Sequence, residues 1–247
     1  MEVSRISSLL GSSLLGSSRE SYPVVLSSLD LLRLRWKPFG PLNTCIKVID
    51  NVLDPSSIQR PYQMGSRTFH PVSTSAASQP PASSILVRQY DLEQWEDDWD
   101  EIHSSHTRSS HGADWAAATQ HEDGVKEEED AEGDSGKGGK LMHCCNEDRP
   151  QNPPSLVVRS STQSFVTIHD FVTTVHPWLQ SVKGDVLSAI GDFRGTPVPA
   201  DTPLVVYCVI PNTFMLLEGS DGTTDFQSTW RDLAEHARQR VNKGIAL

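Results

Sequence analysis

The stretch TIHDFVTTVHPWLQSVKGDVLSAI, residues 167–190, carries the clearest folding signal in this chain of 247 residues. Thr167, with Asp170 three positions later, forms a capping-box-like helix start in which Asp stands where Glu or Gln is usual. Apolar residues then recur with a helical period as far as Ile190. Because Pro177 lacks a backbone N–H, we expect a helix pair or one kinked helix, with Pro177 in the first turn of the second piece.

The residues around this stretch predict further elements of one small fold. Residues 156–158 are apolar and predict a short strand. Residues 204–210, rich in β-branched side chains, and residues 213–217 predict a hairpin around Pro211-Asn212. Residues 225–241 carry apolar side chains on one face and bases at their end, which predicts a closing helix. We therefore expect residues 155–247 to form a small α+β domain.

The N-terminal part of the chain looks poorly suited to a packed core. Residues 1–54 are expected to be a leader of low order with short apolar helices. The apolar residues at 24–36 predict one of these helices, and it could pack on the domain as a satellite, fold with a partner or lie on an anionic surface; packing is the favoured alternative.

Two linkers are predicted. The first is residues 55–90, because 55–84 is rich in Ser, Pro, Thr and Gln, and the second is the Gly/Pro-containing stretch 135–154. Such segments bury too little surface to offset about 1–2 kcal/mol of backbone entropy per residue. The predicted fold class is thus a small α+β C-terminal domain behind a long, largely disordered N-terminal half.

Half of the acidic residues lie in one segment, residues 91–134, which holds 16 Asp or Glu against two bases. The same segment holds three of the six tryptophans. A block of like charge resists compact folding and is typical of tails, linkers and binding segments.

Within this segment, Leu92, Trp95, Trp99 and Ile102 are spaced three, four and three residues apart and fall on one helical stripe. Repulsion between its acids and costly nucleation should keep the free segment unfolded. Docking into an apolar, basic-rimmed groove of a partner protein would bury two indoles, so we predict that these four residues bind a partner. The pattern resembles the acidic–aromatic activation segments of transcription regulators. The alternatives are an acidic linker, or a helix that caps the chain's own C-terminal domain.

Five of the nine histidines lie between residues 103 and 143, close to Cys144 and Cys145. Zinc sites usually repeat paired ligands, and only His103-x₂-His106 and His106-x₄-His111 approximate that spacing. Adjacent cysteines chelate tetrahedrally only with backbone strain. We therefore expect no metal site and no cofactor, and interpret these residues as polar positions in a disordered stretch.

Candidate catalytic residues in residues 155–247 are His169, His176, Asp185 and Cys208. Helix capping, a position before proline and a mid-strand thiol give three of them structural explanations. The sequence holds no Gly-rich phosphate loop and no G-x-S-x-G or H-E-x-x-H motif. The prediction leans against an enzyme, with a small biosynthetic enzyme or accessory protein, its site in residues 155–247, as the alternative.

The sequence as a whole predicts an intracellular interaction or regulatory protein. Nine acids against seven bases in residues 155–247 disfavour nucleic acid as a partner. The longest apolar stretch free of charge, residues 204–217, has 14 residues and is too short to span a membrane. The expected compartment is the cytoplasm or nucleus, with mitochondrial import through residues 1–18 as the alternative. The acidic segment could also mask a basic surface of its own chain.

Overall fold

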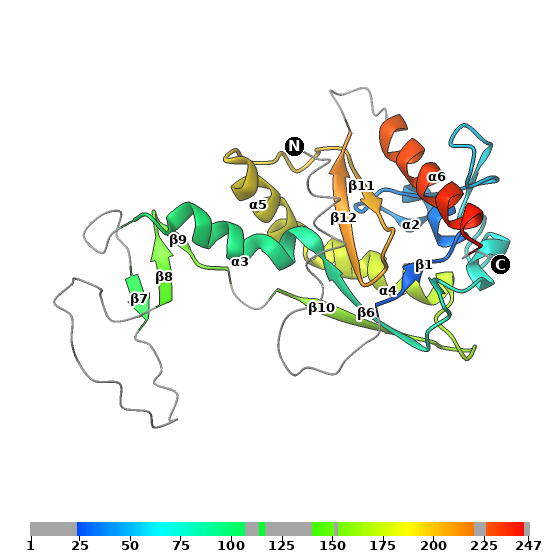
Figure 1. Cartoon of the computed structure of the whole chain (residues 1–247), viewed down its shortest axis with the longest axis horizontal. Helices are drawn as coiled ribbons and strands as arrows, with labels where there is room; N and C mark the ends of the chain where they lie inside the picture. The colour runs from blue at the N-terminus through cyan, green and yellow to red at the C-terminus, as the bar shows by residue number, and fades with distance from the viewer. Residues whose placement is uncertain (1–23, 107–113, 117–139, 151–152, 220–225, 245–247) are drawn as a thin grey trace.

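The structure, a computed structural model, is of mixed α+β class and describes residues 24–106, 114–116, 140–150, 153–219 and 226–244 (Figure 1). Its centre is a four-stranded sheet of order β10-β6-β12-β11. These strands are β6 (Ser84–Gln89), β10 (Ser155–Arg159), β11 (Leu204–Tyr207) and β12 (Thr213–Glu218). β6 pairs antiparallel with β10 and parallel with β12, and β12 pairs antiparallel with β11.

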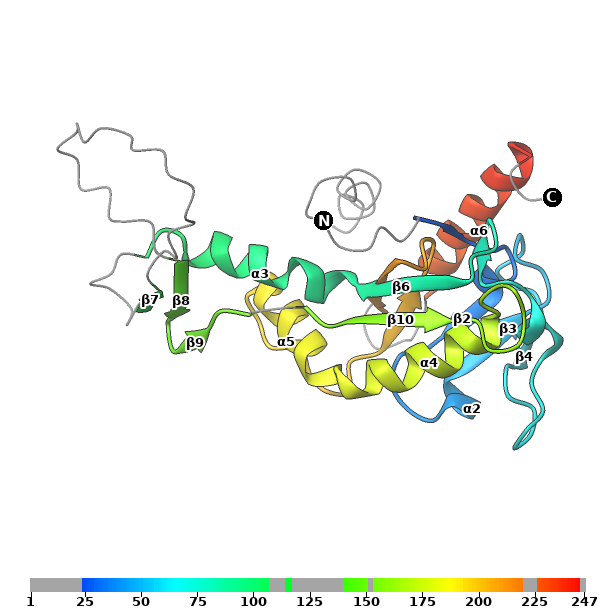
Figure 2. The ribbon, with the colours of Figure 1, turned by 90° about the horizontal axis from the view of Figure 1, so that it is seen from below.

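Helices cover both faces of this sheet (Figure 2). Alternate side chains of a strand point to opposite faces, so Val206 and Leu216 join the core under α4 (Ile168–Ser181) and α5 (Lys183–Arg194). Val205 and Leu217 face the other way and pack with α6 (Gln227–Asn242). The predicted strand, two helices, hairpin and closing helix of the C-terminal part are therefore all present; Asp225, the expected start of the last helix, lies outside the described residues.

The capping box at the start of α4 is confirmed. The Thr167 hydroxyl accepts from the Asp170 backbone N–H at 3.0 Å, and the Asp170 carboxylate accepts from the Thr167 N–H at 3.0 Å. The expected break at Pro177 is wrong, because α4 runs through this proline and the two helices divide at Val182. Burial of the apolar face of α4 on both sides of Pro177, at Val175 and Leu179, outweighs the one backbone hydrogen bond that the proline cannot make.

The N-terminal part of the chain differs from the expectation of disorder. It forms small elements that pack against the sheet and α4: β1 (Leu26–Ser27), η1 (Leu31–Arg33), β2 (Leu34–Trp36), α2 (Leu42–Cys45), β3 (Ile46–Ile49), β4 (Gln59–Pro61), η2 (Pro71–Thr74) and β5 (Ser78–Gln79). Trp36 is 1% exposed and meets Phe171 of α4 edge to face, with ring centroids 6.3 Å apart. Residues 24–36 form two short strands and a 3₁₀ turn rather than the expected α-helix, since β2 pairs with β3 along its whole length.

β6 corrects the predicted linker of residues 55–90 and the boundary near residue 155. This strand lies inside the sheet, between β10 and β12. Its alternating Ile85 and Val87 are buried at 1% and 0% exposure in the same core as α4. Residues on both sides of the expected boundary therefore share one core.

α3 (Tyr90–His103) follows β6 without a break and extends beyond the sheet alongside α5 (Figure 1). At its far end lies a small three-stranded sheet of order β7-β8-β9, formed by β7 (Asp114–Ala116), β8 (Lys140–Cys144) and β9 (Glu147–Asp148). We call this sheet the arm. The acidic stretch 117–139, which connects β7 to β8, lies outside the described residues.

Candidate metal centre

Two histidines stand at the C-terminal end of α3. His103 is the last residue of the helix, and the backbone N–H of His106 donates to the His103 carbonyl at 3.0 Å, so the chain turns once more in a helix-like way. Residues three apart on a helical turn share one side. The two imidazole rings accordingly lie with their centroids 5.2 Å apart.

Two cysteines stand at the turn between β8 and β9. Cys144 pairs with Glu147, and the two residues between them, Cys145 and Asn146, have φ values of 56° and 66°. Two left-handed residues in a two-residue hairpin define a type I′ turn, which Asn favours and which is unusual for Cys. The turn places the sulfur atoms of adjacent cysteines 3.8 Å apart.

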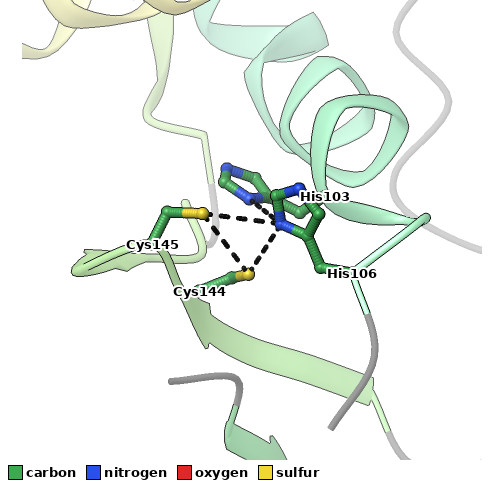
Figure 3. A group of neighbouring side chains, drawn as sticks. All are labelled: His103, His106, Cys144 and Cys145. Atoms are coloured by element: carbon green, nitrogen blue, oxygen red, sulfur yellow. Dashed lines mark hydrogen bonds between the residues drawn. The ribbon is translucent and has the colours of Figure 1, made fainter. Parts of the chain in front are cut away.

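The four side chains converge on one point (Figure 3). One donor atom from each of them lies within 4.8 Å of all the others. His106 Nδ1 is 3.1 Å from Cys144 Sγ, 3.5 Å from Cys145 Sγ and 3.4 Å from His103 Nδ1.

These separations resemble the edges of a zinc tetrahedron. With Zn–S near 2.3 Å and Zn–N near 2.0–2.1 Å, tetrahedral ligands lie about 3.8 Å apart for S···S, about 3.5 Å for S···N and about 3.3 Å for N···N. The S···S, N···N and one S···N separation agree within about 0.1 Å, and the Cys144–His106 contact is shorter. Four of the six separations among these ligand atoms are therefore close to those around a Cys₂His₂ zinc ion, and all six lie within 4.8 Å, so the residues present are the right types and near the right positions to hold one.

The protonation of His103 suits a cation, whereas that of Cys144 depends on whether the ion is present. Burial, and then the neighbouring His106, lower the pKa of His103, so its imidazole is neutral near pH 7 and has a lone pair for a metal. Burial, and then the adjacent Cys145, raise the pKa of the Cys144 thiol when no cation is present. A divalent ion among these atoms reverses that effect, because a coordinating thiol is deprotonated outright.

Two neighbours lie close to His103. Trp99, one turn before His103, lies with its ring centroid 4.4 Å from that of the imidazole. Glu147 Oε2 lies 3.8 Å from His103 Nε2, the nitrogen that points away from the cluster. This separation is too long for a hydrogen bond, so the carboxylate is a charged neighbour of the ring and not its hydrogen-bond acceptor.

Arg149 fastens the arm to α3 beside this cluster. Its side chain is 7% exposed and forms an ion pair with Asp100 and a 2.9 Å ion pair with Glu96, both on α3. It also donates to the Leu141 carbonyl of β8 at 3.2 Å. The guanidinium thus connects the helix to the hairpin that carries the cysteines.

The predicted partner-binding stripe is mostly turned toward its own chain. Leu92 is 3% exposed in the main core, and the indole N–H of the half-buried Trp95 donates to Asp192 of α5 at 2.6 Å. Trp99 is 1% exposed and packs with Leu141 and Cys144. Ile102 remains 47% exposed. The helix thus packs on its own chain, as in the alternative interpretation of the stripe.

Ile102 lines a cavity of about 550 Å³ between the arm and the end of α5. His103, Cys145 and Glu147 line it from the side of the metal ligands, and Asp192 lines it from α5. Half of the four-residue cluster is therefore exposed to this cavity.

The candidate catalytic residues do not come together. Both ring nitrogens of His176 are engaged, since Nδ1 accepts from Trp36 Nε1 at 3.0 Å and Nε2 donates to the Gly40 carbonyl at 2.8 Å. Cys208 is buried against Ser27, and burial raises the pKa of its thiol to about 12. His169 packs against Phe69, with the two rings tilted and their centroids 4.5 Å apart. Asp185 borders a second cavity, of about 200 Å³, near Trp95 and Pro150.

The cluster of His103, His106, Cys144 and Cys145 argues against the expectation of no metal site, because it brings together four groups that could hold a metal ion. Its sequence signal is a His-x₂-His pair at the end of an amphipathic stripe together with a Cys-Cys-Asn turn. Neither half resembles a paired zinc motif by spacing alone, and 37 residues separate the two halves. The other cluster histidine considered from the sequence, His111, lies outside the described residues.

Comparisons with known proteins add no family. A scan against protein-family models and searches of curated proteins and solved structures find no match for this chain. In the part of the chain that the structure describes, no helix is long and apolar enough to cross a membrane.

Proposed function

We propose that this protein binds one zinc ion through Cys144, Cys145, His103 and His106, and that the ion fastens the arm to the end of α3. The observation that carries the proposal is the set of four donor atoms within 4.8 Å of one another. A tetrahedral S₂N₂ ligand set is typical of zinc. Four protein ligands leave no open coordination position, which supports a structural rather than a catalytic role.

The small size of the arm's core supports the same role. Its buried side chains in the described residues are Trp99 from α3 with Leu141 and Cys144 from β8. Short sheets need a larger apolar face or an additional link to remain folded. Structural zinc contributes about 10–16 kcal/mol of apparent binding free energy in small zinc domains, which exceeds what three buried side chains supply.

The test is the metal content of the full chain, purified with reductant and zinc and measured by elemental mass spectrometry. We expect one zinc per chain, and a large loss in His106→Ala and Cys144→Ser. His143→Ala is the matched control, because His143 precedes Cys144 on the same strand but pairs with Asp148 at 2.8 Å instead. A chain without zinc, or a control that loses as much as His106→Ala, would overturn the proposal.

A second proposal concerns the interaction role that the sequence predicts. The cavity beside Ile102 carries two carboxylates, Glu147 and Asp192, and in the described residues neither pairs with a lysine or an arginine. We propose that a partner protein inserts a basic side chain here, with its aliphatic stem against Ile102. The acidic helix then forms the groove wall, whereas the sequence predicts an acidic helix that enters a basic-rimmed groove.

This proposal is tested with two small probes on the zinc-loaded full chain. N-acetyl-arginine amide should perturb the Trp99 fluorescence, and N-acetyl-norleucine amide, which has the aliphatic stem without the charge, should bind several-fold more weakly. The double variant Glu147→Gln/Asp192→Asn should remove that preference. Equal binding of the two probes, or binding of neither, would refute this basic-residue site.

A further inference from the structure

The four cysteines of the chain differ in their access to solvent. Cys45, Cys144 and Cys208 are buried, with exposed fractions of 7%, 0% and 8%, whereas Cys145 is only partly buried. Cys145 also lines the cavity of about 550 Å³ beside Ile102 and Glu147. A small molecule in this cavity therefore meets one sulfur atom of the metal centre and not the other.

The turn places a second sulfur atom behind the accessible one. Cys145 Sγ and Cys144 Sγ lie 3.8 Å apart. The left-handed backbone at Cys145, with φ of 56°, brings side chains that would otherwise diverge to the same side. Once Cys145 is modified, Cys144 is the nearest thiol among the described residues that could attack it.

We propose that hydroperoxides oxidise Cys145 and that this oxidation releases the metal ion. This inference rests on the proposed zinc centre, because coordination supplies the thiolate that reacts. The accessible cavity selects Cys145 over the other three cysteines, and a small hydroperoxide fits within the cavity volume.

The reaction uses two electrons from the two thiolates. The Cys145 thiolate attacks one oxygen of hydrogen peroxide, the O–O bond breaks, and a sulfenic acid and one hydroxide form. The Cys144 thiolate then attacks the Cys145 sulfur, the S–O bond breaks, and a disulfide and a second hydroxide form. Both sulfur atoms are oxidised, the peroxide is reduced to two water molecules after protonation, and zinc leaves because two of its ligands are lost.

The product should be easily reversed. Adjacent Cα atoms lie about 3.8 Å apart across a trans peptide, below the usual 4.4–6.8 Å range for disulfides. Strained disulfides are more readily reduced. A mild thiol should therefore regenerate both ligands and restore zinc binding.

The experiment uses the zinc-loaded full chain, whose zinc content is measured first. Hydrogen peroxide is added, zinc release is followed with a chromogenic chelator, and peptide mass spectrometry locates the oxidised cysteines. We expect one zinc released per chain together with a Cys144–Cys145 disulfide, and recovery with dithiothreitol and zinc. Cys45→Ser and Cys208→Ser are controls that should respond as the natural sequence does.

A second variant tests the order of the two steps. Cys144→Ser is expected to lose zinc, so it is oxidised at about pH 9, where a free thiol ionises without a metal. No thiol stands behind Cys145 in this variant, so its sulfenic acid should persist and react with dimedone, whereas the natural sequence under the same conditions should form the disulfide. Zinc that stays bound under peroxide, or first oxidation at Cys45 or Cys208, would overturn this inference and leave the zinc proposal intact. A chain that holds no zinc before peroxide is added would instead overturn the proposed function, and this inference with it.

Discussion

The central sheet and the arm of this protein are held together in different ways. The sheet is covered on both faces by helices, and its cores include large fully buried side chains such as Trp36, Phe171 and Phe214. Among the described side chains, the arm contributes Leu141 and Cys144 to a small cluster with Trp99, and Arg149 connects it to α3, together with the zinc ion that we propose. Where a region is too small to bury enough apolar surface, a few polar and metal-ligating residues must supply its stability.

Removal of the metal should produce the largest difference in stability between the two regions. After chelation, backbone amides of residues 140–150 should lose most of their protection from hydrogen exchange, because the arm's remaining core is small. Amides of β11 and β12 should keep theirs. Equal loss of protection in both regions would mean that the arm is not stabilised separately.

A substitution that leaves a cavity in the main core should destabilise the sheet and leave the arm unaffected. Phe171 is 0% exposed between Trp36 and the sheet, so Phe171→Ala should lower the free energy of unfolding by about 3–5 kcal/mol. Denaturant titration measures this loss, while the zinc content of the folded variant should not change. Loss of zinc from still-folded Phe171→Ala would contradict the separation of the two regions.

Arg149 should matter for the arm and little for the sheet. Arg149→Ala removes charged hydrogen bonds to Glu96 and Asp100, which should cost the arm about 1–3 kcal/mol, although Glu96 keeps its ion pair with Lys140. Arg149→Lys should recover only part of this, because a lysine cannot bind a carboxylate with two parallel N–H groups. Hydrogen exchange of residues 140–150 measures the difference between these variants. Full recovery by lysine would argue that the charge alone is sufficient.

The smallest expected effect is a pH dependence of the main core. Burial lowers the pKa of His176 below its usual 6.5, so the unfolded chain takes up this proton more readily than the folded one. The contribution of His176 is present above pH 6.5 and is lost as the pH falls below 6.5 toward the folded-state pKa.

Protonation of His176 would also remove the acceptor for the Trp36 indole N–H. His176→Gln keeps a donor for the Gly40 carbonyl but does not titrate. Its unfolding free energy should therefore fall less between pH 7.5 and pH 5.5 than that of the natural sequence, as measured by urea titration. An identical fall would assign the acid sensitivity to other buried histidines, such as His70 and His103, whose pKa values burial also lowers.

Short-range signals alone determined several elements of this protein. The capping box of Thr167 and Asp170, the two helices that follow and the hairpin of β11 and β12 depend on contacts within a few residues. The sequence also predicted the apolar stripe of α3, because the apolar residues recur at a helical period within one helix. The alternation of Ile85 and Val87 is typical of a strand, but the Ser/Pro-rich residues before them led to the prediction of a linker.

The tertiary structure decided which of these elements meet. β6 became an inner strand because β10 and β12 supply its partners from 67 or more positions away in sequence, the shortest separation being that of Arg88 and Ser155. Leu92, Trp95 and Trp99 of the α3 stripe turned inward because the main core, α5 and the arm cover them, whereas Ile102 stayed exposed. His103 and His106 meet Cys144 and Cys145 only through the hairpin that returns to the end of α3. Composition and local periodicity report how each segment prefers to fold, whereas the pairing of distant segments depends on how the whole chain buries its apolar surface.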